Sequence, residues 1–122
     1  EQDERSLAFT ELDSSKVQLV TYLHEDETSI TGEERLQKAN HIRLDAQIFL
    51  TLWQNQHLIP EAWKKKTNGH TTYIFFDGTV LRGPVGYRYA LFLYWFGSGW
   101  GWGYRWLGSD WRASAPSAVL AS

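Results

Sequence analysis

The chain has 122 residues, which gives one domain enough apolar material to bury a core without disulfides or metal ions. It contains no cysteine, which excludes disulfides, thiolate zinc sites and cysteine nucleophiles. The formal net charge is only −2, but residues 1–34 carry ten acids against two bases, and residues 35–122 carry ten bases against four acids.

This uneven charge predicts an acidic N-terminal arm over residues 1–14, which is solvated, covers the basic remainder or steers partners to it. The longest uncharged run, Tyr89–Tyr104, has sixteen residues and includes four glycines. A helix needs about 20 apolar residues to cross a bilayer, so we expect no membrane span. Because cysteine is absent and no apolar leader is visible, we expect a cytoplasmic protein.

The first elements predicted along the chain are a strand and a long helix. Lys16–Leu23 is rich in β-favouring residues and predicts the strand. Thr31, followed three residues later by Glu34, forms a capping box that marks a helix start. Apolar residues then recur at spacings of three and four, so we expect one helix over residues 32–56.

A second, short helix is predicted immediately afterwards. Pro60 is favoured at the first position of a helix, so we expect a helix over residues 61–66. Trp63 is the large apolar residue of this segment and is expected to be buried. Asn68-Gly69 is typical of a turn and ends the segment.

Residues 72–107 predict a β-meander. Its expected strands are 72–76, 79–82, 87–96 and 100–107. Asp77-Gly78 is a two-residue hairpin sequence between the first two strands. Glycine-rich turns at residues 83–86 and 97–99 separate the others.

This order of elements predicts an α+β fold. One long and one short helix are expected to pack on a four- to five-stranded, mainly antiparallel and strongly twisted sheet. We expect a single domain over residues 1–122. Its segments are the arm 1–14, the strand and helices 15–71, the meander 72–107 and a C-terminal tail 108–122.

Aromatic residues are concentrated in the meander, where eleven of the nineteen lie between residues 87 and 111. Side chains alternate between the faces of a strand, so the last strand has four rings on one face and Gly101, Gly103 and Arg105 on the other. The four rings, called here the aromatic row, are Trp100, Trp102, Tyr104 and Trp106. Helices lying over the glycines would leave the row exposed as a binding platform; the alternative is that the row is the core of a curled sheet.

The function favoured by these residues is that of a small, non-enzymatic binding module. The aromatic row would supply the anchors, with Arg88 and Arg105 nearby. Trp, Tyr and Arg are typical anchors of protein interfaces, so the expected partner is another protein, including a second copy of this chain. Single-stranded nucleic acid is the alternative partner, because bases stack on rings interleaved with Arg and Lys. We expect no cofactor and no metal ion.

Enzyme motifs are weak in this sequence. Ile74–Thr79 resembles the first motif of haloacid-dehalogenase-type phosphatases, but the nucleophilic aspartate of that family falls on Phe75. His41 and Asp45 can share a face of the predicted helix, while His57 lies about 160° around it from His41. We therefore expect a protein that is not an enzyme; a small hydrolase or nuclease built on the histidines is the enzymatic alternative.

Three short stretches, Phe76–Arg82, Leu93–Trp95 and Trp106–Trp111, are similar to segments of short uncharacterised bacterial proteins. The resemblance covers the C-terminal half and part of the predicted helix. It implies a bacterial or phage origin and no known activity, so it assigns no functional residues.

Overall fold

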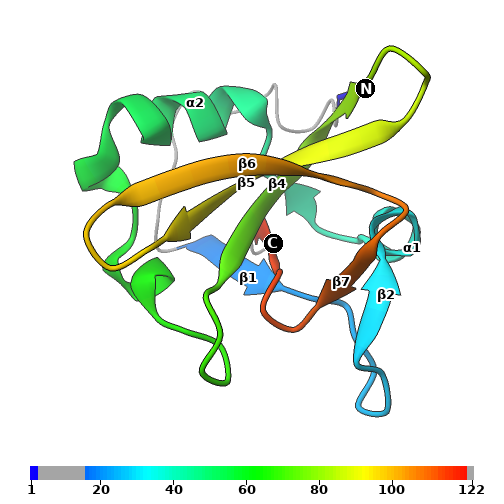
Figure 1. Cartoon of the computed structure of the whole chain (residues 1–122), viewed down its shortest axis with the longest axis horizontal. Helices are drawn as coiled ribbons and strands as arrows, with labels where there is room; N and C mark the ends of the chain where they lie inside the picture. Colours follow the sequence, from blue (N-terminus) through cyan, green and yellow to red (C-terminus); the bar gives the residue numbers. More distant parts are fainter. Residues whose placement is uncertain (3–15, 121–122) are drawn as a thin grey trace.

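The computed structural model describes residues 1–2 and 16–120 (Figure 1). The acidic arm expected over residues 1–14 therefore lies almost entirely outside the described residues. Helices and strands are both present, which confirms the α+β class. The strands are β1 Val17–Val20, β2 Ser29–Thr31, β3 Ile42–Arg43, β4 Tyr73–Arg82, β5 Arg88–Trp95, β6 Trp100–Trp106, β7 Asp110–Arg112 and β8 Ser117–Leu120. The helices are α1 Gly32–Lys38, α2 Ala46–Gln54 and the 3₁₀ helices η3 Gln56–Leu58 and η4 Glu61–Lys64.

One sheet of six strands, rather than the four or five expected, organises the described residues, in the order β1-β8-β4-β5-β6, with β3 also paired to β8. Its pairs are antiparallel except for β4 and β8. Strand β8 lies inside this sheet and all four of its residues are buried. The segment 108–122, which was expected as a tail, therefore contains the interior strand β8. It also contains β7, which pairs with β2 in a second, two-stranded sheet.

The single helix predicted over residues 32–56 is wrong, because a strand and a second helix cap interrupt it. Ile42-Arg43 leave the helical path to pair with β8 as β3. Asp45 then caps α2, its carboxylate accepting a hydrogen bond from the Ile48 N–H at 3.0 Å. The capping box of Thr31–Glu34 at the start of α1 is confirmed.

The predicted hairpin at Asp77-Gly78 is also wrong, because β4 continues through it. The pairing of β4 with β5 shifts between Phe76 and Leu81, so the strand bulges here. The Gly78 N–H donates to the Leu44 carbonyl oxygen at 2.8 Å, and a Cβ on Gly78 would lie 2.4 Å from the carbonyl oxygen of Arg43. The glycine therefore serves a close approach of two backbones rather than a turn.

Each face of the sheet packs against a different part of the chain. On one face α2 contacts the sheet through Phe49, whose ring centroid lies 5.5 Å from that of Phe76. On the other face Trp111 stacks on Phe75 at 4.1 Å, and the Arg35 guanidinium of α1 lies 5.0 Å from the Trp111 ring. Figure 1 shows α2 and the unit of α1, β2 and β7 at opposite ends of the molecule.

Candidate functional site

The aromatic row follows β6, and its four rings differ widely in exposure. Trp100 is buried, with 9% of its surface accessible, whereas Trp102, Tyr104 and Trp106 keep 50%, 63% and 47%. Helix α2 lies on the same side of the sheet as the row, where the Phe49 ring is 6.1 Å from that of Trp102. The row therefore belongs to the core at its first residue and faces solvent over the remaining three.

The sequence analysis expected a fully exposed row if helices covered Gly101 and Gly103 on the opposite face of β6. Helix α2 does not lie over these glycines, so the row is not fully exposed. The glycines instead face rings of the neighbouring strand. A Cβ on Gly101 would lie 2.5 Å from the Tyr94 ring, and one on Gly103 would lie 2.7 Å from the Phe92 ring. Small residues at these positions let β5 fold its rings flat against the back of β6.

Two tyrosines of β5 and the preceding turn extend the exposed part of the row. The Tyr87 ring lies 5.5 Å from that of Trp106, and the Tyr89 ring lies 5.4 Å from that of Tyr104. Tyr87 is 53% exposed. We call these residues the aromatic patch: Tyr87, Tyr89, Trp102, Tyr104 and Trp106. The alternation of aromatic residues in Tyr87–Trp95 indicated this extension, but the predicted site did not include it.

The patch lies at an edge of the sheet. Among the described residues β6 pairs only with β5. The Leu107 N–H donates to the Arg88 carbonyl oxygen at 2.9 Å, and hydrogen-bonded positions alternate along an antiparallel pair. The backbone N–H and C=O groups of Trp102 and Tyr104 consequently point outward, away from β5.

The two arginines of the predicted site do not join the aromatic row. Arg88 forms ion pairs with Glu1 and Glu33, both at 2.5 Å, and its hydrogen bonds to Glu1 raise the pKa of the guanidinium. Arg105 lies on the opposite face of the sheet, 5.2 Å from the Tyr73 ring and 5.4 Å from that of Phe75. Burial lowers the pKa of Arg105. Both side chains support the fold behind the row.

A buried charged cluster, which the sequence analysis did not predict, links α1, β4 and β8. The Ser117 hydroxyl donates to Oδ2 of Asp77 at 2.8 Å, and Arg35 donates to the Ser117 hydroxyl at 3.3 Å and to the Ala115 carbonyl oxygen. Burial raises the pKa of Asp77 and lowers that of Arg35 to about 10, so Arg35 is protonated at neutral pH. The signal in the sequence was Asp77 directly after the apolar run Ile74–Phe76, which the sequence analysis interpreted as part of a hairpin turn.

The histidines are not brought together. His41 shares a hydrogen bond of 2.7 Å with the Tyr22 hydroxyl, while His24, His57 and His70 are exposed. Within residues 1–2 and 16–120, no group of three or more His, Asp or Glu side chains is placed to hold a metal ion. Over the same residues, no helix has the length and apolar character needed to cross a membrane.

Comparison of the chain with protein-family models, curated proteins and solved structures finds no match. The aromatic patch at the β6 edge is the largest group of exposed apolar rings in the described structure. It is therefore the candidate site from which a function is proposed.

Proposed function

We propose that the protein is an interaction module that pairs edge to edge, through β6, with a second copy of itself. The observation that carries this proposal is the coincidence of outward-facing backbone groups and exposed rings on one strand. Main-chain hydrogen bonds across the new strand pair would supply affinity, and the aromatic patch would supply specificity.

Strand β6 lacks the features that normally prevent edge pairing. Proteins protect exposed edges with lysine, proline, bulges or very short strands. The seven residues of β6 include no lysine or proline, and the pairing with β5 runs without a shift. Its one charged residue, Arg105, stacks on rings behind the sheet. An unprotected apolar edge of this kind is typical of a strand that has a partner.

The sequence of β6 suits pairing with itself. In a two-fold antiparallel arrangement centred on Gly103, Trp102 lies opposite Tyr104 of the second copy. The outward-facing backbone groups of both residues then meet their equivalents, so one surface serves both subunits. Arg105 lies opposite Gly101 in this register, so no like charges are brought together.

The exposed area is compatible with a dimer of modest affinity. Tyr87, Trp102, Tyr104 and Trp106 each keep about half of their surface exposed. With roughly 150 to 250 Å² for each aromatic side chain, these rings offer on the order of 400 Å². A standard interface buries about 800 Å² on each partner, so the rings would supply about half of that area and the strand edge with its flanking residues the remainder.

The test is the oligomeric state of the wild type and of Tyr104→Lys, measured by sedimentation and light scattering over a range of concentrations. Tyr104 is 63% exposed, so the substitution changes the surface while the fold is kept, which circular dichroism checks. We expect a dimer for the wild type and a monomer for Tyr104→Lys. Val85→Lys is the matched control, because Val85 is 77% exposed in the β4–β5 turn and should leave the dimer intact.

Hydrogen exchange then separates edge pairing from other contacts. The amides of Trp102 and Tyr104 should exchange slowly in the dimer and quickly in Tyr104→Lys. A wild type that stays monomeric at high concentration, or a dimer in which these amides exchange quickly, contradicts the proposal. Tight binding of an oligothymidylate that weakens steeply with salt and depends on Tyr104 would replace it with the nucleic-acid alternative.

A further inference from the structure

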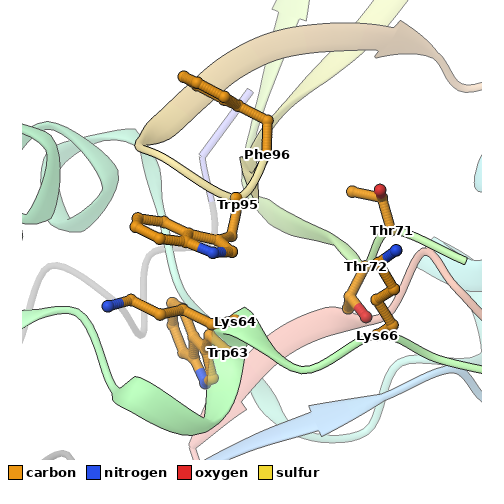
Figure 2. Close-up of a pocket in the computed structure, with 8 residues that line it drawn as sticks. Trp63, Lys64, Lys66, Thr71, Thr72, Trp95 and Phe96 are labelled. Atoms are coloured by element: carbon orange, nitrogen blue, oxygen red, sulfur yellow. The ribbon is translucent and has the colours of Figure 1, made fainter.

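A pocket of about 400 Å³ lies at the opposite end of β6 from the exposed rings, beside the turn that joins β5 to β6. Figure 2 shows Trp95 and Phe96 on one side of this pocket and Lys66, Thr71 and Thr72 across from them. Small-molecule sites usually have volumes of about 300 to 1,000 Å³, so this pocket lies at the lower end of that range.

The wall next to the turn is aromatic and firmly anchored. Trp95 packs edge-to-face on buried Trp100, with ring centroids 5.2 Å apart. Trp63 is buried and forms the floor with Lys64. Phe96, which also lines the pocket, is in contrast 56% exposed. Flat apolar surface is thus available to a bound ring.

The pocket is also positively charged. Two lysines and no acidic residue contribute to its lining. Lys64 is held in place, with its ammonium 4.3 Å from the Trp95 ring and 3.1 Å from the Glu61 carboxylate. Lys66 forms no ion pair or hydrogen bond with the residues that the structure describes, and its ammonium is therefore available to an anion.

From this combination we infer that the pocket binds a planar aromatic anion, of which a nucleoside 5′-monophosphate is the representative. The ring lies against Phe96 and Trp95, and the phosphate is bound by Lys66, with the Thr71 hydroxyl on the same wall. The inference does not depend on the pairing of β6, because none of these residues belongs to the aromatic patch.

Three neighbouring lysines provide a test with a matched control. Lys66 lines this pocket and Lys65 does not; Lys65 lines a neighbouring hollow, to which Lys66 also contributes. Binding of AMP is measured by calorimetry and by the change in tryptophan fluorescence. We expect Lys66→Gln to weaken binding about five- to tenfold at low salt and Lys65→Gln to change it less than about twofold.

Partial ligands separate the two contributions. Adenosine and inorganic phosphate should each bind at least about tenfold more weakly than AMP, because each lacks one of the two contacts. Phe96→Ala should weaken AMP and adenosine alike, and circular dichroism checks that this exposed position leaves the fold intact.

Several outcomes overturn the inference. These are no AMP binding at millimolar concentration, equal binding of AMP and adenosine, and equal effects of Lys65→Gln and Lys66→Gln. An oligonucleotide that binds far more tightly than AMP and uses all three lysines equally would indicate an extended nucleic-acid surface instead. Tyr104→Lys should leave AMP binding unchanged, so failure of the dimer and failure of this site are distinguishable.

Discussion

Truncating the aromatic row to alanine, one residue at a time, should destabilise the protein in proportion to the burial of each ring. Trp100 is 9% exposed, and replacing a buried tryptophan by alanine typically costs about 3 to 5 kcal/mol. Trp102 is 50% exposed, so its truncation should cost about 2 kcal/mol. Tyr104 is 63% exposed, and its truncation should cost about 1 kcal/mol.

Urea unfolding followed by circular dichroism measures these differences. With a denaturant dependence of about 1 to 3 kcal/mol per molar urea, Trp100→Ala should lower the midpoint by 1 M or more, on the order of several times the shift of Tyr104→Ala. The measurements are made at two protein concentrations, because a dimer unfolds at higher urea when it is more concentrated. Equal losses for Trp100→Ala and Tyr104→Ala in the monomer would refute the assignment of one as core and the other as surface.

Three further predictions concern the fold that supports the row. Gly78→Ala should lower the free energy of unfolding by several kcal/mol or prevent folding, because the new Cβ would meet backbone atoms at 2.4 and 2.7 Å. Gly86→Ala has open space around its Cβ but a positive φ of 87°, so it should cost only about 1 kcal/mol. Thermal unfolding of the two variants compares these losses. Burial raises the pKa of Asp77 above its ordinary value of 3.8, so the unfolded chain loses this proton at a lower pH than the folded protein does. The free energy of unfolding should therefore fall as pH rises from about 3.8 to the raised pKa of the folded protein. Asp77→Asn should remove this fall, and identical pH profiles of stability for the two proteins would contradict the prediction. Thr31→Ala should cost about 1 kcal/mol by removing the cap of α1, with Thr28→Ala, in the preceding loop, as the control in urea unfolding.

Local signals in the sequence predicted local structure well. The period-two pattern of Tyr87–Trp106 predicted β5 and β6, and the spacing of Thr31 and Glu34 predicted the start of α1. In each case the information lies within a few residues, where side-chain alternation and a cap hydrogen bond act.

Non-local pairings were the source of the errors. The helical pattern of residues 32–56 is interrupted because Ile42-Arg43 find a partner in β8, almost 80 residues away. Asp77-Gly78 has the composition of a turn, yet it contacts Leu44 and Ser117 inside the fold. No short window of sequence contains these partners, so propensity gave way to tertiary contacts.

The exposure of the aromatic row was only partly predictable for a related reason. Alternation correctly placed the four rings on one face and Arg105 on the other. It did not indicate which face α2 would cover, because either side of β6 offers an apolar surface. The contact between Phe49 and Trp102 decides this, and it joins elements that are distant in sequence.

The interior position of β8 has a consequence for how the chain acquires its structure. Residues 17–20 pair with residues 117–120, so β1 has no partner strand among the described residues until β8 has been synthesised. The same is true of β3, and β4 lacks its second neighbour until that moment. Contacts between such distant segments make folding slow, because a long loop must close before the pairing compensates for the lost entropy. On the ribosome, β4, β5 and β6 can pair with one another earlier, but β1 and β3 can join the sheet only after residues 117–120 have left the exit tunnel.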